Sequence, residues 1–298
     1  MITVPPGFGA GLGDGAPAWV ATLPALAEEL CVRWDLVPDG GVLHGFVAVV
    51  LPVRRADGTR AVLKLTWRDV ETEHEALALR LWDGRGVVRL LDHDDERGAL
   101  LLERLDHTRS LTDAPIGVAL DVVGGLLRDL RVPAPPEVHR AGVGDLAAKA
   151  VSGTVPVPLL DAAVAIARDL AADVGDTLVN GDLHYDNVLA GERAPWLMID
   201  PKPSAGDPEF CLIPLLWNRF DELAGPADMW RRFDALVDVA GLDADKARGW
   251  ALARAVEAAF WARRAGVPGF GTASSTVAGW LFAGRGGPRG AAAGAAAD

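Results

Sequence analysis

Apolar and polar positions follow a strand-like period in the first third of the chain. Short apolar runs predominate up to residue 106, and Asp57-Gly58 between two of them is a hairpin signal. The runs predict strands at 33–37, 44–53, 60–67, 87–91 and 99–105, with helices at 17–31 and 69–82. We therefore expect a β-rich N-terminal lobe over 1–106.

Helical periodicity dominates after residue 106. The predicted helices are 115–130, 144–150, 158–174, 208–223, 226–240 and 243–265, and a β-rich island covers 176–200. The Gly/Ala-rich tail, 284–298, is predicted to be disordered. The order of elements indicates the α+β fold class, with a second, mostly helical lobe over 107–298.

Composition excludes several classes of protein. The 298 residues suit one large domain or two lobes, and 29 basic against 41 acidic side chains give a net charge of −12. This balance argues against a protein that binds nucleic acid through phosphate neutralisation. No run approaches the roughly 20 apolar residues of a membrane span, and no basic segment of a secretory signal opens the chain. Cys31 and Cys211 form neither a disulfide framework nor a zinc site. We expect a cytoplasmic protein without membrane partners.

One of the four lysines lies inside a predicted apolar strand. Lys64 is flanked by Ala-Val-Leu and Leu-Thr-Trp, and a cation buried there needs a partner or an anionic ligand. Glu71 and Glu75 in the following predicted helix are four residues apart and so share one face. A lysine that points outward from a half-exposed strand fits the alternation equally well.

A second group of polar residues follows the predicted strand 177–179. The segment NGDLHYDN, 180–187, places Asp182 and Asn187 five apart in a tight loop, where a carboxylate can face a hydroxyl and an amide oxygen can bind a cation. Asp200 ends a hydrophobic strand and is a predicted Mg²⁺ ligand. An isolated Asp after a strand is usually a turn former. The order Lys, Glu, Asp-x₄-Asn, Asp, however, matches phosphoryl transfer in protein-kinase-like folds.

Two motifs resemble the aminoglycoside phosphotransferase family. They are LVNGDLHYDNVL, 178–189, and LMIDPKP, 197–203, and they are closest to its streptomycin 6-kinase and hydroxyurea kinase branch. The resemblance runs from about Trp34 to Arg264. It implies a bilobal protein-kinase-like fold, with 1–106 the nucleotide-binding lobe including the hinge. The implied activity is ATP- and Mg²⁺-dependent phosphorylation of a hydroxyl on an antibiotic such as streptomycin.

The resemblance also implies roles for residues of the two motifs and of the strand before them. Asp182 would accept or orient the proton of the substrate hydroxyl, and Asn187 and Asp200 would hold Mg²⁺ on the ATP phosphates. Lys64 would contact the α- and β-phosphates and be positioned by Glu75, with Glu71 as the alternative partner.

The hinge and the departures from the family pattern involve other residues. Segment 102–105, which includes Glu103 and Leu105, would be the hinge whose backbone groups bind adenine. Asn180 stands where the family loop often has His, and we expect it to tune catalysis. Cys211-Leu212-Ile213 replaces an Asp-containing segment, so that Asp207 is a candidate to brace the loop instead.

Weaker candidates for contacts with the acceptor are Asp207, Trp217, Asp221, Glu222 and Glu257. A solvated helix end explains Asp221 and Glu222 as well, and a salt bridge with Arg254 or Arg264 explains Glu257. The segment 176–222 holds nine acidic and three basic residues, a net charge of −6, which favours a cationic small-molecule substrate. The sequence does not determine the oligomeric state.

Two other functions fit parts of the pattern. One is a metabolic kinase of an amino sugar, hydroxyurea or another small alcohol. The other is a pseudokinase-like protein that binds nucleotide without turnover. Intact Lys64, Asp182, Asn187 and Asp200 argue against the second.

Overall fold

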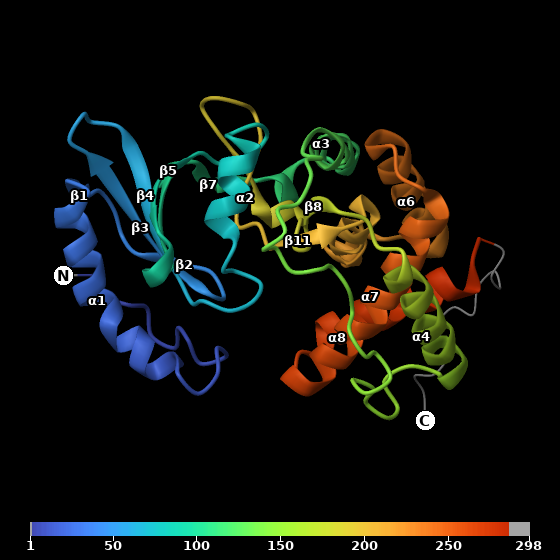
Figure 1. Ribbon diagram of the computed structural model, residues 1–298. Coiled ribbons are helices and arrows are strands. Elements are labelled where there is room, and N and C mark those ends of the chain that lie inside the picture. Colours follow the sequence, from blue (N-terminus) through green and yellow to red (C-terminus); the bar gives the residue numbers. More distant parts are fainter. Residues whose placement is uncertain (1, 286–298) are drawn as a thin grey trace, which may run out of the picture.

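The first part of the chain forms an antiparallel sheet with two helices. A computed structural model describes residues 2–285 (Figure 1). The helices are α1 (Ala16–Arg33) and α2 (Glu75–Trp82), and the strands are β1 (Leu36–Pro38), β2 (Leu43–His44), β3 (Ala48–Arg55), β4 (Arg60–Thr66), β5 (Leu90–Asp94) and β6 (Ala99–Glu103). The strand order is β1-β3-β4-β6-β5, with β2 paired to β3. The predicted hairpin turn at Asp57-Gly58 joins β3 to β4.

Both faces of this sheet are covered at its centre. Leu63 of β4 packs with Leu23 of α1 in one hydrophobic cluster. Val62 packs against a second cluster that includes Leu102 and residues of α2. Because side chains alternate along a strand, Lys64 points to the face of Val62, and it is only 3% exposed. The reading of Lys64 as an outward-facing lysine is therefore wrong.

The second part of the chain contains two small sheets surrounded by helices. Its strands are β7 (Asp106–Ser110), β8 (Thr177–Asn180), β9 (Val188–Ala190), β10 (Leu197–Met198) and β11 (Pro203–Gly206). They pair as β10-β9-β7 and as β11-β8. Its helices are α3 (Ile116–Asp129), α4 (Val157–Ala172), α5 (Ile213–Trp217), α6 (Pro226–Ala240), α7 (Ala244–Ala265) and α8 (Pro268–Ala283). Figure 1 shows β8 and β11 near the middle of the molecule, between the large sheet and the C-terminal helices.

Three predicted helices differ from the structure. The α2 helix starts at Glu75 rather than at 69, because the Asp69 carboxylate accepts the backbone N–H groups of Glu71 and Thr72 and forms a turn. The segment 144–150 forms turns instead of a helix. The predicted helix 208–223 is divided into the 3₁₀ helix Pro208–Cys211, α5 and the 3₁₀ helix Phe220–Glu222. Arg219 interrupts it with a left-handed φ of 60°.

The α8 helix was not predicted. Its sequence, PGFGTASSTVAGWLFA, is rich in Gly, Ser and Thr, which have low helix propensity. Its buried residues Val277, Ala278 and Leu281 pack within the large core, and α8 lies against α7. Of the tail predicted to be disordered, residues 286–298 lie outside the described residues. Over residues 2–285, no helix combines the length and the apolar character needed to span a membrane.

Candidate functional site

Lys64 holds two carboxylates from different parts of the chain. Its Nζ lies 2.6 Å from Glu75 Oε1 and 3.0 Å from Asp200 Oδ1. Burial alone would lower the pKa of Lys64, but the charges of Asp200 and Glu75 outweigh it and raise that pKa, so that Lys64 stays a cation. Glu75, which is also 3% exposed, is thus the partner of Lys64, and Glu71 is not.

Asp182 and Asn187 come from the loop between β8 and β9. The Nδ2 atom of Asn187 donates a hydrogen bond to the backbone oxygen of Asp182 at 3.1 Å. The backbone oxygen of Asn187 accepts the N–H of Ile199 at 2.8 Å. Asp200 then turns the chain sharply with a φ of 50°, a conformation rare outside glycine. These bonds bring the loop and the end of β10 together.

The oxygen donors of this arrangement fit Mg²⁺ on a triphosphate. Asn187 uses its Nδ2 atom within the loop and has its Oδ1 atom available, and Asp200 has a second carboxylate oxygen beside the one that contacts Lys64. Mg²⁺ in proteins is commonly held by one or two such oxygens together with phosphate oxygens. A metal cluster of three or more His, Cys, Asp or Glu side chains is absent from residues 2–285.

Asn180 ties the two motifs to each other. Its Oδ1 atom accepts the backbone N–H groups of both Asp182 and Lys202, each at 2.9 Å. Its Nδ2 atom donates to the sulfur of Met198 at 3.2 Å. Asn180 therefore fixes the backbone that carries the carboxylate of Asp182.

Arg254 of α7 also holds this loop, a role that sequence reasoning missed. Its Nη2 atom donates to the backbone oxygen of Gly181 at 2.7 Å, and its Nη1 atom donates to that of Phe210 at 2.5 Å. The guanidinium carbon lies 4.1 Å from the centre of the Phe210 ring. No spacing rule links residue 254 to residue 181, so the sequence held no signal for this contact.

Asp207 does neither of the things predicted for it. It is 4% exposed, and its carboxylate accepts hydrogen bonds from the backbone of Gly175 at 3.1 Å, Lys246 at 3.1 Å and the indole of Trp250 at 2.9 Å. It therefore joins the start of α7 to the segment before β8. None of these partners belongs to the loop between β8 and β9, and α7 packs over the carboxylate.

Asp182 lines a cavity of about 330 Å³, which we call the acceptor cavity. Its polar lining includes Glu71, His139, Lys149, Lys202, Ser204 and Glu257. Glu257 is paired with Lys149, and neither Arg254 nor Arg264 makes the salt bridge expected for it. The buried Oγ atom of Ser204 and Nδ1 atom of His139 have no hydrogen-bond partner among the described residues. The cavity thus has polar groups available for a ligand.

Lys202 lies between two acids of this cavity. Its Nζ is 3.0 Å from Glu71 Oε2 and 3.4 Å from Asp182 Oδ2. Burial would lower the pKa of Lys202, but Asp182 and Glu71 outweigh it and raise that pKa, so that the side chain is charged.

The acidic segment 176–222 does not gather at the acceptor cavity. Of its nine acids, Asp182 is the one that lines the cavity, whereas Asp207 and Glu209 are buried against α7 and its N-terminus. Lys149 and Arg254 from other segments add positive charge to the lining. The net charge of segment 176–222 therefore does not give the net charge of the acceptor cavity.

Three weaker candidates lie outside the lining of the acceptor cavity. Trp217 packs edge-on against Phe270, with ring centroids 5.2 Å apart. Glu222 forms an ion pair with Arg219 at 2.6 Å, and Asp221 is exposed beside it. Their contacts with substrate stay predictions.

The hinge segment joins β6 to β7 through Arg104 and Leu105. Among the backbone hydrogen bonds of turns and loops over residues 2–285, none involves the N–H or C=O group of Arg104 or Leu105. Glu103 differs, because its N–H donates to the oxygen of Arg89 at 3.0 Å and its carboxylate accepts from Arg193 at 2.6 Å. Within the predicted hinge, Arg104 and Leu105 are thus the residues whose backbone groups make no such bond, and the binding of adenine there stays a prediction.

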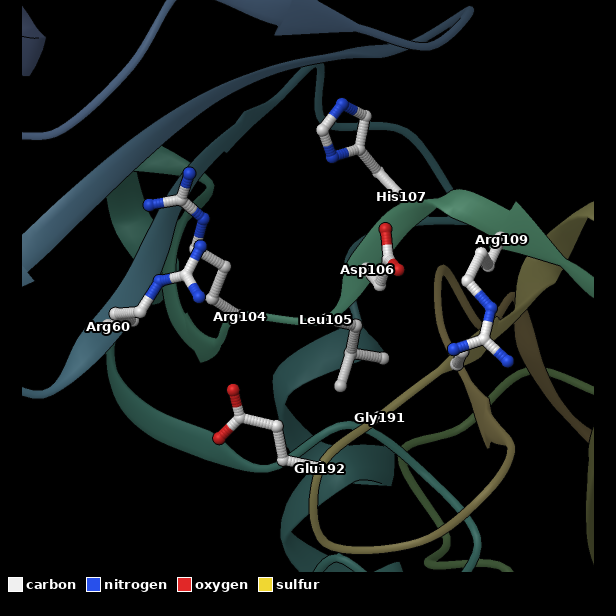
Figure 2. A pocket seen from close by; sticks show the side chains of 9 residues that line it. Arg60, Arg104, Leu105, Asp106, His107, Arg109, Gly191 and Glu192 are labelled. Carbon is white, nitrogen blue, oxygen red and sulfur yellow. The ribbon is translucent and has the colours of Figure 1, made fainter.

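A second cavity, of about 390 Å³, lies beside the hinge (Figure 2). Figure 2 shows the side chains of Arg60 and Arg104 next to each other, with Glu192 turned toward them. Leu105 also lines the cavity, and Arg104 contacts Asp39 at 2.7 Å. Its lining is mainly charged, in contrast to the apolar walls that a purine ring requires.

Comparisons with known proteins agree with this arrangement. Residues 33–266 match the family described as aminoglycoside/hydroxyurea antibiotic resistance kinase. A streptomycin 6-kinase from Streptomyces glaucescens is 43% identical over 285 residues, covering 89% of this chain and 91% of the relative. A hydroxyurea phosphotransferase from Kitasatospora aureofaciens is 46% identical over 263 residues, covering 84% of this chain and 76% of the relative.

A solved structure confirms the fold. It is a thermostable mutant of the aminoglycoside phosphotransferase APH(4)-Ia in a ternary complex with ADP and hygromycin B, with a TM-score of 0.59 and 15% identity. The match covers 88% of this chain and 99% of that one. The fold is therefore bilobal and protein-kinase-like, as expected. From the extent of the sequence match, the chain belongs to the aminoglycoside/hydroxyurea antibiotic resistance kinase family.

Proposed function

We propose that this kinase transfers the γ-phosphoryl group of ATP to a hydroxyl of a streptomycin-like aminoglycoside and thereby confers resistance to the antibiotic. The observation that carries the proposal is the position of Asp182. Its side chain lines the acceptor cavity, and its backbone oxygen accepts a hydrogen bond from Asn187. Asn187 in turn is hydrogen-bonded to the residue before Asp200, and Asp200 contacts Lys64. The 43% identical streptomycin 6-kinase supports the choice of acceptor.

The residues divide the work of the reaction as follows. Asn187 and Asp200 would hold Mg²⁺, which when bound supplies positive charge to the phosphates of ATP. Lys64 adds its own positive charge to the nucleotide phosphates. Asp182 accepts the hydrogen bond of the acceptor hydroxyl and aligns its oxygen. Catalysis then comes from positioning and electrostatics.

The lining of the acceptor cavity indicates how a polar acceptor is bound. Ser204 and His139 offer unused hydrogen-bonding atoms, and Glu257 offers a carboxylate to a guanidinium or ammonium group in place of Lys149. We place this reaction in the cytoplasm, where ATP is available.

A second candidate acceptor is hydroxyurea. A hydroxyurea phosphotransferase is 46% identical to this chain. The acids of the acceptor cavity, Glu71, Asp182 and Glu257, are each paired with a lysine, so the cavity also suits a neutral acceptor. The two acceptors differ in charge and size, and a direct assay separates them.

The test is ATP consumption with Mg²⁺ over streptomycin, other aminoglycosides, amino sugars and hydroxyurea. We expect turnover with streptomycin, loss of turnover in Asp182→Asn, and preserved ATP binding in that variant. Asp176→Asn is the matched control, because Asp176 is an exposed acid of the same segment outside the cavity. Full activity of Asp182→Asn would overturn the role of Asp182. ATP binding without turnover of any acceptor would instead indicate a pseudokinase.

A further inference from the structure

Lys202 is a cation of the site to which the proposed mechanism assigns no task. It lies two residues after the proposed metal ligand Asp200, and its Nζ lies 3.4 Å from the carboxylate of Asp182. It lines the acceptor cavity, and its side chain is 32% exposed. Lys202 is therefore within reach of both the catalytic carboxylate and any ligand in the cavity.

The backbone of Lys202 is held in register with the catalytic loop. Its N–H donates to Asn180 Oδ1 at 2.9 Å, and its carbonyl accepts the N–H of Gly181 at 2.9 Å. Asn180 Oδ1 accepts the N–H of Asp182 at the same time. Lys202 and Asp182 are thus carried by one hydrogen-bonded unit, and the position of the amine relative to Asp182 is set by the fold.

The second partner of Lys202 is easily exchanged. Glu71 lies in the turn before α2, in the first part of the chain, and its side chain is 56% exposed. An ion pair with a partner this exposed to water contributes little to stability. Lys64 is different, because its amine is buried and held by Glu75 at 2.6 Å. Lys202 can therefore leave Glu71 for a more highly charged group at small cost.

We propose that Lys202 is a second catalytic lysine, which contacts the transferred phosphoryl group beside Asp182 and rests on Glu71 when no nucleotide is bound. This inference rests on the proposed kinase function. In the step, the acceptor oxygen forms a bond to the γ-phosphorus, and the bond from that phosphorus to the β-phosphate oxygen breaks. The electron pair leaves with ADP, and the hydroxyl proton passes to the Asp182 carboxylate. Lys202 stays protonated and offsets charge on the phosphoryl oxygens.

The first test measures equilibrium binding, without turnover. Titration calorimetry with Mg²⁺ compares ADP with AMP-PNP, which keeps a γ-phosphate, for the wild type and Lys202→Met. We expect ADP affinity to change less than twofold and AMP-PNP affinity to fall about tenfold. Lys202→Arg should retain most of the AMP-PNP affinity, because it keeps the charge.

The second test measures turnover with the same variants. Lys202→Met should lower kcat by about 10²- to 10³-fold with less than a threefold change in the KM for ATP, as expected for a charge that acts on the transition state. Glu71→Gln removes the resting partner but keeps the amine, so it should lower kcat much less than Lys202→Met does. Glu73→Gln is the control, because Glu73 is an exposed acid of the same turn outside the acceptor cavity, and its kcat should stay within threefold of the wild type.

Each remaining outcome overturns the inference. An unchanged ratio of ADP to AMP-PNP affinity in Lys202→Met would make Lys202 a structural partner of Asp182 only. Equal weakening of both nucleotides would point to general damage of the site. A loss of kcat in Glu71→Gln as large as that in Lys202→Met would assign the effect to the ion pair. Failure of the wild type to bind either nucleotide would overturn the proposed function itself, which separates the two failures.

Discussion

The loop between β8 and β9 carries two aspartates whose partners differ. Asp182 faces Lys202 and the acceptor cavity. Asp186 lies 3.3 Å from the Nδ1 atom of His184 and accepts hydrogen bonds from Thr112 at 2.7 Å and Asn218 at 3.0 Å. The close approach of His184, followed by the hydrogen bonds from Thr112 and Asn218, lowers the pKa of Asp186 although partial burial opposes this. Asp186 therefore holds the loop and is not a candidate base.

This depressed pKa predicts a dependence of stability on pH. In the unfolded chain Asp186 has an ordinary pKa near 3.8, so the ionised carboxylate stabilises the folded state above about pH 4. That contribution is lost as the pH falls through the lower folded pKa. We expect Asp186→Asn to be less stable than the wild type at pH 7, with a difference that shrinks between pH 5 and pH 3.

Urea unfolding midpoints of both proteins between pH 3 and pH 7 measure this effect. Asp176→Asn serves as control, because its exposed carboxylate has no such hydrogen bonds and its midpoint should follow the wild type at every pH. A constant difference between Asp186→Asn and the wild type down to pH 3 would contradict the prediction.

At the scale of elements, α3 and α6 approach closely at one glycine. A Cβ atom added to Gly124 of α3 would lie 2.7 Å from Val239 Cγ1 and 2.8 Å from Val239 Cβ, on α6. The next residue, Gly125, faces open space, with only the end of the Arg128 side chain within 4 Å. The two adjacent glycines thus have different reasons to lack a side chain.

We predict opposite effects of the same substitution at these two positions. Gly125→Ala should stabilise the protein by about 0.5–1 kcal/mol, because alanine has the higher helix propensity. Gly124→Ala should destabilise it by about 1–3 kcal/mol, because the clash with Val239 outweighs that gain. Chemical unfolding gives both values, and adding Val239→Ala should recover part of the loss in Gly124→Ala. Equal effects at the two positions would show that this contact does not control the packing.

At the scale of the whole molecule, two ion pairs join the two parts of the chain across the site. Lys64 of β4 contacts Asp200, and Glu71 contacts Lys202. The Lys, Arg, Asp and Glu charges that line the acceptor cavity nearly cancel, because the four bases Arg140, Lys149, Lys202 and Arg254 lie beside the three acids Glu71, Asp182 and Glu257. Any electrostatic attraction of a cationic acceptor therefore comes from the net charge of −12 of the whole molecule and not from the cavity lining.

This field predicts that salt affects cationic and neutral acceptors differently. At saturating ATP and Mg²⁺, kcat/KM for streptomycin should fall several-fold between about 0.02 and 0.3 M NaCl, because the Debye length shrinks to below about 10 Å. The same titration with hydroxyurea, which is uncharged, should be nearly flat. Equal salt dependence for both acceptors would show that the field does not draw the acceptor to the enzyme.

Local patterns determined much of this structure from the sequence. The helices α3, α4, α6 and α7 lie within two residues of the predicted ends, because their periodicity is long and regular. Asp182 and Asn187 lie in one short loop, so their spacing alone placed them together. The α8 helix was not predicted, because its residues have low helix propensity and packing against α7 stabilises it.

The sequence by itself determined the fold class and the family, and it predicted the site residues Lys64, Asp182, Asn187 and Asp200, because these depend on periodicity and on short motifs. Only the tertiary structure decided which partner each charged group receives. Arg254 reaches Gly181 across 73 positions of sequence, and Lys149 reaches Glu257 across 108. The same packing buried Asp207 under α7 and placed Lys202 on Asp182. Such contacts depend on how the helices pack against the loop between β8 and β9. No local sequence pattern encodes a contact between residues so far apart in the chain.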